Sequence, residues 1–257
     1  MVKQGLRSRT GIAASPYTNG PYTWSEDVTF YGRISESPER YGLSEDYAQR
    51  PMLNASVGIA ANVDFEILGT NVAEANVTWA TTIGGLELKT ATTSGDQVIV
   101  LPHLDTLQSA WTGVKWGTEN QVIWEAVIRT GASVAAVVIW AGLKLTNTSV
   151  VATDDDQAFF RFDASADTNW KAIYSIGGTD SSNDTGVAVA ANTNVYFRIE
   201  LDSDRKAHFF INEVEVLVST ALTNDVDLIP YVGVQTGAAA AKIINLVSQR
   251  ISRIIFE

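Results

Sequence analysis

The stretch NVYFRIELD (194–202) decides the fold class, because its residues alternate between apolar and polar along the chain. In an extended strand, its apolar residues at the odd positions 195 to 201 fall on one face and its polar residues fall on the other. The polar segment Ser203 to Arg205 follows, and the alternation resumes in KAHFFIN (206–212). We therefore predict two half-buried antiparallel strands that form a hairpin.

On both sides of this hairpin, from residue 63 onward, short β-type runs are separated by Gly, Asn, Asp and Thr, and no amphipathic helix stands out. A second hairpin is expected across Gly131 to Ser133. This pattern is typical of an all-β antiparallel sandwich or barrel rather than of βαβ units. The clearest predicted strands cover residues 122–130, 134–145, 157–163, 170–176, 195–202, 206–212 and 243–256.

Residues 1–60 differ from the rest, because they are rich in proline and tyrosine and lack sustained periodicity. We predict an extended N-terminal arm over 1–60, followed by one β-sandwich domain over 61–257. Aromatic side chains bury a large area at low entropic cost, which suits contact with a partner. A lead-in that packs on its own domain is the equal alternative. The expected partner contacts in the arm are Tyr17, Tyr22, Trp24, Phe30 and Tyr31.

The composition limits the function. A formal charge of −11 and a pI of about 4.6 argue against a nucleic-acid partner. The chain has no cysteine, which excludes thiolate catalysis and cysteine-bound zinc. No apolar run is long enough for a signal peptide or a membrane span, so we expect no membrane partner and assembly in a host cytoplasm.

The common catalytic motifs are absent, and we predict no catalytic residue, no metal and no cofactor. The nearest glycosidase-like pattern is Glu200, Asp202 and Asp204, whose alternation would place three carboxylates on one face. Asp202 and Asp204 also flank the predicted turn, where Asp is favoured because its side chain bonds to the local backbone. We favour the turn. His208 is expected on the outer face of its strand, without a nucleophile beside it.

The tryptophans raise the question of glycan binding, since sugars stack on exposed indoles. Trp124 and Trp140 lie within apolar strands and are predicted to be core residues. Trp111 and Trp116, in QSAWTGVKWGTEN (108–120), are the better candidates for a glycan or surface contact. Clustered acidic residues in the loops could in principle bind calcium, but such loops are usually solvated and no metal site is predicted.

The order of several segments is similar to that in the concanavalin A-like or laminin-G-like jelly rolls of tailed-bacteriophage virion proteins. In these domains a Phe-Arg-Phe-Asp strand leads through Asn-Trp to a strand ending in Gly-Gly-Thr, and a Phe-Arg-Ile-Glu strand turns into a Phe-Phe-Ile-Asn strand. The resemblance covers residues 63–257 and implies an antiparallel jelly-roll β-sandwich. The matching residues are Phe160, Arg161, Phe162, Asp163, Trp170, Gly177, Gly178, Phe197, Arg198, Ile199 and Phe209.

The resemblance also bears on the role, although fold alone does not fix function. The sequence shows no heptad or internal repeat of the kind that builds fibre shafts. We therefore expect a non-enzymatic virion protein that decorates the capsid surface, with the major capsid protein as partner and a homotrimer as the natural assembly. The apolar segment Val134 to Trp140 could help form the trimer interface. A tail-fibre or receptor-binding module that binds glycans is the main alternative, and a glycoside hydrolase is the third.

Overall fold

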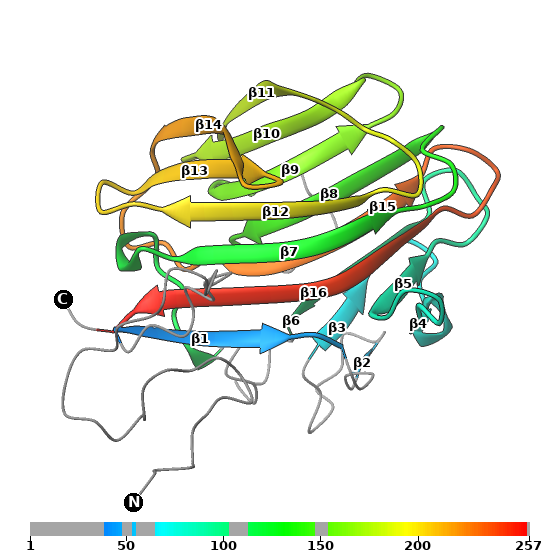
Figure 1. Cartoon of the computed structure of the whole chain (residues 1–257), viewed down its shortest axis with the longest axis horizontal. Helices are drawn as coiled ribbons and strands as arrows, with labels where there is room; N and C mark the ends of the chain where they lie inside the picture. The colour runs from blue at the N-terminus through cyan, green and yellow to red at the C-terminus, as the bar shows by residue number, and fades with distance from the viewer. Residues whose placement is uncertain (1–38, 48–52, 55–64, 103–112, 147–153, 256–257) are drawn as a thin grey trace, which may run out of the picture.

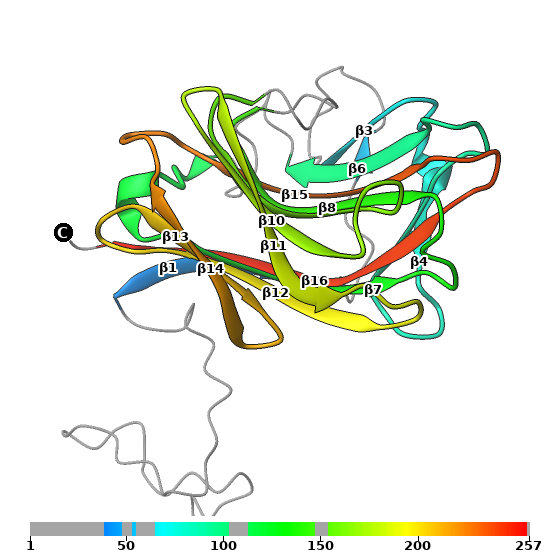
Figure 2. The same ribbon diagram turned by 90° about the horizontal axis from the view of Figure 1, so that it is seen from above.

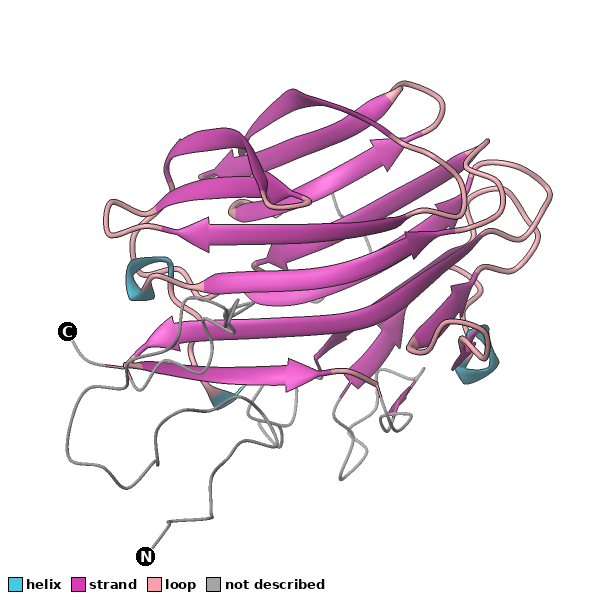
Figure 3. Ribbon diagram, viewed as in Figure 1, coloured by secondary structure: helices cyan, strands magenta, loops and turns pink. Residues whose placement is uncertain are grey.

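The structure is a computed structural model that describes residues 39–47, 53–54, 65–102, 113–146 and 154–255. Strands dominate it, as Figure 3 shows. The short 3-10 helices in this part of the chain are η2 (Glu74–Asn76) and η3 (Thr118–Asn120). Within the same ranges, no helix has the length and apolar character needed to cross a membrane.

The strands form two eight-stranded sheets that lie one on the other (Figures 1 and 2). Every pairing is antiparallel except that of β2 with β3. Sheet A contains β1 (Arg40–Glu45), β4 (Val77–Trp79), β5 (Leu86–Lys89), β7 (Ile123–Thr130), β12 (Asn194–Leu201), β13 (Lys206–Ile211), β14 (Val214–Ala221) and β16 (Ile243–Ile254). Sheet B contains β2 (Leu53–Asn54), β3 (Phe65–Leu68), β6 (Gln97–Pro102), β8 (Val137–Lys144), β9 (Gln157–Asp163), β10 (Asn169–Ile176), β11 (Thr179–Ala188) and β15 (Ile229–Thr236). The predicted all-β antiparallel sandwich is confirmed.

The core between the sheets is centred on aromatic rings. Phe197 of β12 stacks on Phe160 of β9 with ring centroids 4.5 Å apart, and Trp170 of β10 meets Phe197 edge-on at 4.8 Å. Phe209 of β13 meets Phe160 edge-on, with ring centroids 5.4 Å apart. These four residues come from both sheets and are at most 1% exposed. The apolar face predicted from the alternation of residues 194–202 is therefore the face that holds the two sheets together.

The hairpin predicted across residues 203–205 is confirmed, because β12 pairs with β13 in the register Leu201 to Ala207. The one predicted across Gly131 to Ser133 is wrong. The strand before it, β7, lies in sheet A, whereas the strand after it, β8, lies in sheet B. Both strands are apolar enough to pair with each other, and alternation alone does not tell a hairpin from a connection between layers.

The N-terminal boundary of the sandwich also differs from the prediction. Residues 40–45, expected in the arm, form β1 and pair with residues 249–254 of β16. Tyr47 is 1% exposed, and its hydroxyl accepts a hydrogen bond from Gln249 Nε2 at 3.1 Å. The predicted arm of 1–60 is therefore corrected: residues 39–47 belong to the β domain.

The apolar segment Val134 to Trp140 is largely accounted for within one chain. Val137 and Ile139 belong to the core between the sheets and are at most 2% exposed. Trp140 is 6% exposed and lies in a second apolar cluster on the outer face of sheet B. Burial in the monomer explains the apolar composition of these three residues without a subunit contact, and the homotrimer stays a prediction.

A buried ion pair lies on the outer side of sheet B, at the end of β8. Lys144 Nζ lies 3.6 Å from Asp154 Oδ2, and the two side chains are 1% and 3% exposed. Asp154 also accepts hydrogen bonds from the backbone amides of Leu145 and Thr146, at 3.1 and 3.0 Å, and from the Thr146 hydroxyl at 2.7 Å. Asp154 thus fixes both the chain after β8 and a buried cation.

Candidate functional site

The outer face of sheet A carries the polar residues of the alternating strands. In β12 and β7 the core-facing residues are buried, and the intervening ones, including Arg198, Glu200 and Glu125, point away from the core. The register brings such residues side by side: Glu200 lies opposite His208 of β13, and Arg198 lies opposite Glu125 of β7. Ionisable side chains from three neighbouring strands, β7, β12 and β13, therefore share one surface.

A pocket of about 280 Å³ lies on this face where β12 ends and β1 and β7 begin, at the left end of sheet A in Figure 1. We call it the Glu200 pocket. Its lining combines carboxylates, cations and apolar side chains from β1, β7, β12, β13 and β14 together with flanking residues: Arg40, Gln121, Ile123, Glu200, Leu201, Asp202, His208, Phe210 and Glu215.

His208 is held between two carboxylates in this pocket. Its Nε2 lies 3.2 Å from Asp202 Oδ2, and its Nδ1 lies 3.0 Å from Glu215 Oε2. Partial burial acts to lower the pKa of His208, but the two carboxylates outweigh it and raise the pKa above the ordinary value. The imidazole is thus stabilised in its charged form, with both ring nitrogens donating.

Asp202 both forms the turn and contributes to the pocket. Its Oδ1 accepts hydrogen bonds at 2.8 Å from the backbone amides of Asp204 and Lys206, as expected for an Asp that begins a turn. Partial burial acts to raise the pKa of Asp202, but these amides and His208 lower it. Asp204 points away from the pocket: its side chain is 74% exposed and lies 3.8 Å from Lys206 Nζ. The turn interpretation is confirmed, and of the three carboxylates only Glu200 and Asp202 line the pocket.

Arg40 enters the pocket from β1. Its guanidinium donates to the backbone oxygens of Gln121 and Ser252, and its Nε donates to Ser252 Oγ at 3.2 Å. Burial lowers the pKa of Arg40, while the charges of Glu200 and Glu125 act in the opposite direction. Sequence reasoning missed Arg40 because it lies in the segment expected to be an arm, far in sequence from the strands that it joins.

Arg198 lies between the Glu200 pocket and the middle of the outer face of sheet A. Its Nη1 lies 3.1 Å from Glu200 Oε1 and its Nη2 lies 3.5 Å from Glu213 Oε2. The guanidinium also lies over the Phe210 ring, 4.1 Å from the centroid, a cation–π contact. Beside it, the Tyr196 hydroxyl donates to Glu125. Burial, followed by the Glu125 hydrogen bond, raises the pKa of Tyr196 above its ordinary value, so this phenol stays protonated.

The titration of His208 provides a direct test of this arrangement. Because its folded-state pKa is raised, His208 contributes stability fully below about pH 6.5, and the contribution is lost as the pH rises through the folded pKa. Asp202 behaves oppositely, since its lowered pKa makes its contribution disappear only at acidic pH. We expect the NMR titration midpoint of His208 to lie above about 6.5 and to fall in Glu215→Gln. A midpoint at or below about 6.5 in the unaltered protein would contradict the network.

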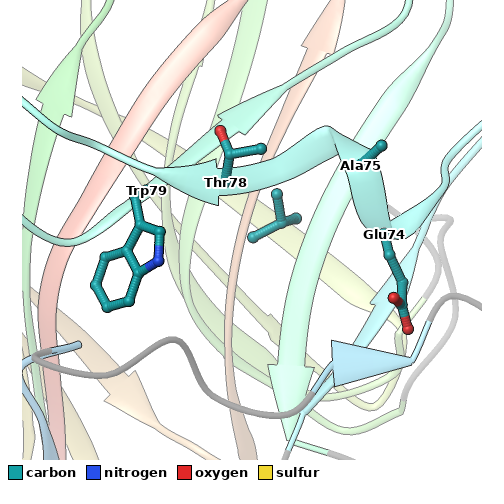
Figure 4. A pocket seen from close by; sticks show the side chains of 5 residues that line it. Glu74, Ala75, Thr78 and Trp79 are labelled. Atoms are coloured by element: carbon teal, nitrogen blue, oxygen red, sulfur yellow. The ribbon is translucent and has the colours of Figure 1, made fainter.

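A second aromatic feature lies at the edge strand β4 (Figure 4). The side chains of Trp79 and Glu74 point to one side of the chain in this view, and Thr78 points to the other. They line a pocket of about 340 Å³ together with Ala75 and Val77. Trp79 is 42% exposed, which makes it the exposed indole of the described residues. Sequence reasoning did not single it out, because β4 was not predicted.

The expected exposure of Trp116 is wrong. This side chain is 1% exposed and stacks on Tyr41 of β1, with centroids 6.2 Å apart. The polar residues around Trp116 suggested a solvated loop, but β1, which the sequence did not predict, covers this side chain. Trp124 is buried as predicted, and Trp170 lies in the core as well. The other predicted contact residues, Trp111 and the arm residues Tyr17, Tyr22, Trp24, Phe30 and Tyr31, lie outside the described residues.

The ionisable residues of the described ranges do not gather into a group of three or more that could hold a metal ion. The Glu200 pocket offers carboxylates, an imidazole, a guanidinium and an aromatic ring. Ionised carboxylates accept hydrogen bonds, and the imidazolium and guanidinium donate them. An aromatic ring beside them offers an apolar face. This combination fits a polyhydroxylated ligand, which presents both hydroxyl groups and apolar ring faces.

Comparison with known proteins finds solved structures of similar fold but no protein of similar sequence. No family model matches the chain, and no curated protein sequence matches it. Solved structures do match. The chain is similar to an endo-acting O-glycanase of the human gut microbiota, with a TM-score of 0.59, 7% identity and coverage of 82% of this chain and 98% of that one. It is also similar to a β-glucanase of Bacillus licheniformis, with a TM-score of 0.54, 10% identity and coverage of 82% and 97%.

A third similar structure is the carbohydrate recognition domain of Emp46p, with a TM-score of 0.51, 6% identity and coverage of 73% of this chain and 88% of that one. At such identities the likeness concerns the fold. The virion role implied by the sequence resemblance finds no support in these three structures and stays a prediction.

The prediction that the chain is not an enzyme is overturned by the same structures. Two of the three are glycan-cleaving enzymes. Missing sequence motifs do not exclude catalysis on this fold, because carboxylates brought together by strand register leave no contiguous motif. The chain has a concanavalin A-like jelly-roll fold, the architecture also found in carbohydrate-binding and glycan-cleaving proteins.

Proposed function

We propose that this protein recognises a glycan on the outer face of sheet A, at the Glu200 pocket. The observation that carries the proposal is the convergence of Glu200, Asp202, His208 and Arg40 on one hollow beside the Phe210 ring. Ligand sites typically combine an apolar surface with a few well-placed polar groups. Here Glu200, His208 and Arg40 come from strands of sheet A, and Asp202 follows β12 directly.

The positions of these groups are fixed before any ligand arrives. Two backbone amides and His208 hold Asp202, and backbone oxygens and Ser252 hold Arg40. A preorganised site loses less side-chain entropy on binding. We expect sugar hydroxyls to donate to Glu200 and Asp202, with a sugar ring against Phe210.

Cleavage of the bound glycan is the second candidate function, and the pairing of Glu200 with Asp202 in one pocket favours it. Glycoside hydrolysis uses two carboxyl groups, one to protonate the leaving oxygen and one to act as base or nucleophile. Asp202 suits the ionised role, since three hydrogen bonds favour its charged form. Glu200, the carboxyl group that β12 contributes to the pocket, is then the candidate for the proton transfer.

The test is a glycan array followed by calorimetry on the glycans that bind. We expect Glu200→Gln to weaken binding about tenfold or more, because a hydrogen bond to a charged group is lost. Asp204→Asn is the matched control: it lies in the same turn, outside the pocket, and should bind like the unaltered protein.

Product analysis by mass spectrometry on the same glycans separates the two candidate functions. Cleavage that Glu200→Gln abolishes would establish hydrolysis, whereas intact glycan after prolonged incubation would leave recognition alone. Failure of a broad array to bind, or an unchanged affinity in Glu200→Gln, would contradict the proposed site.

Capsid decoration is a separate proposal that rests on the sequence resemblance and the aromatic residues of the N-terminal segment. It places the protein on a virion with the major capsid protein as partner. Electron microscopy of the particle would test it, since decoration requires copies over the capsid lattice.

A further inference from the structure

A second pocket lies on the outer face of sheet A, at the end opposite to the Glu200 pocket. It has a volume of about 260 Å³, and we call it the Arg129 pocket. Its polar lining comes from β5, β7, β16 and the loops beside them: Thr81, Thr82, Glu87, Arg129, Asn192 and Asn245. The lining therefore includes both hydrogen-bond donors and acceptors.

The strand register places these groups in one row across the sheet. Asn194 of β12 lies opposite Arg129, Arg129 lies opposite Asn245, and Asn245 lies opposite Glu87. The Arg129 guanidinium donates to Asn194 Oδ1 at 3.2 Å. Among the described residues, no carboxylate lies within ion-pair distance of Arg129, so most of its donors are available to a ligand.

The same strand supplies both pockets. Ile123 of β7 lines the Glu200 pocket and Arg129 lines the other. These residues are separated by about 20 Å at the ordinary rise of a strand. β7 and β12 run antiparallel between the two ends, as Figure 1 shows. Their outward residues Glu125, Val127, Tyr196 and Arg198 lie between the pockets, so the surface that joins the pockets is polar except at Val127.

The charges of the Glu200 pocket indicate which sugars it accepts. Three carboxylates line it, Glu200, Asp202 and Glu215, against one guanidinium and one imidazole. Both cations already have protein partners: Arg40 donates to backbone oxygens and Ser252, and His208 is shared by two carboxylates. An anionic sugar would meet repulsion there without a cation to bind it.

We infer that the outer face of sheet A binds one extended polysaccharide chain, which lies along β7 and β12, contacts both pockets and is uncharged in the segment that the Glu200 pocket holds. The inference rests on the proposed function and adds the length and the charge of the ligand. The Glu200 pocket holds one segment of the chain, and Arg129 with Glu87 and Asn245 holds a second segment about 20 Å away.

The experiment compares a length series of neutral oligosaccharides, taken from the glycan that the array identifies. We expect affinity to rise about tenfold or more once the oligomer spans both pockets, because hydrogen bonds to charged groups are added. Arg129→Ala should remove this gain and leave the affinity for the shortest binding oligomer unchanged, which also shows that the variant is folded. Lys89→Ala is the control: it removes an exposed cation of β5 that lies on the same face of sheet A but outside the pocket. It should change neither the gain with length nor the affinity for the shortest oligomer.

Three outcomes would overturn the inference. Equal affinity for short and long oligomers in the unaltered protein would show that one pocket suffices. An unchanged length dependence in Arg129→Ala would remove the second pocket, and equal binding of a uronic-acid oligomer of matched length would remove the charge preference. In each case Glu200→Gln would still weaken binding if the proposed function holds; the absence of binding to any oligomer would refute that function as well.

Discussion

Replacing Phe197 with alanine is expected to lower the free energy of unfolding by about 3–5 kcal/mol. The ring is fully buried, stacks on Phe160 at 4.5 Å and receives the edge of Trp170 at 4.8 Å. Truncation removes these contacts and leaves a cavity between two sheets that other strands hold in place. Urea denaturation followed by tryptophan fluorescence measures the change.

Phe210→Ala is the matched control, because Phe210 lies in the adjacent strand but on the outer face, under Arg198. Losing this cation–π contact and partial burial should cost about 1 kcal/mol. The same variant should weaken glycan binding, since Phe210 lines the Glu200 pocket. A loss of stability in Phe210→Ala as large as that in Phe197→Ala would contradict the assignment of inner and outer faces.

The second large effect is expected at the buried ion pair of sheet B. Asp154→Asn should lower the free energy of unfolding by about 3–5 kcal/mol, because it removes the carboxylate beside a buried ammonium group. Lys144 Nζ lies 3.6 Å from Asp154, and burial already lowers the Lys144 pKa against the effect of Asp154. Urea denaturation at neutral pH gives the value.

A double variant distinguishes the charge effect from the loss of backbone contacts. In Lys144→Met with Asp154→Asn, the buried charge is gone, so the protein should be more stable than Asp154→Asn alone. The remaining deficit reports on the hydrogen bonds that Asp154 accepts from Leu145 and Thr146. A double variant that is less stable than the single one would show that the ion pair is not what stabilises this region.

The sequence predicts the strands that have one buried face. β12 lies one residue earlier than its predicted range at both ends, and β13 ends one residue before its predicted end, because their alternation indicates the core-facing residues directly. The bounds of β9 (Gln157–Asp163) coincide with the prediction, although this strand is buried on both faces. β11 (Thr179–Ala188) was not predicted: it is an edge strand with exposed and half-buried residues, and its polar composition is typical of a loop.

The site was harder to predict than the fold, because its parts come together only through non-local pairing. The position of His208 on an outer face follows from alternation, but its partner Glu215 belongs to β14, which was not predicted. Arg40 reaches the pocket because β1 pairs with the last strand of the chain. Short-range patterns carry no information on such contacts.

The pairing of β1 with β16 also determines where the chain can be shortened for laboratory work. Deleting residues 1–50 would remove the edge strand, Arg40, the Tyr41 ring that stacks on Trp116, and the buried Tyr47. Such a truncation would expose the buried Trp116 and remove Arg40 from the lining of the Glu200 pocket. An expression clone meant to retain the site must therefore begin upstream of residue 39.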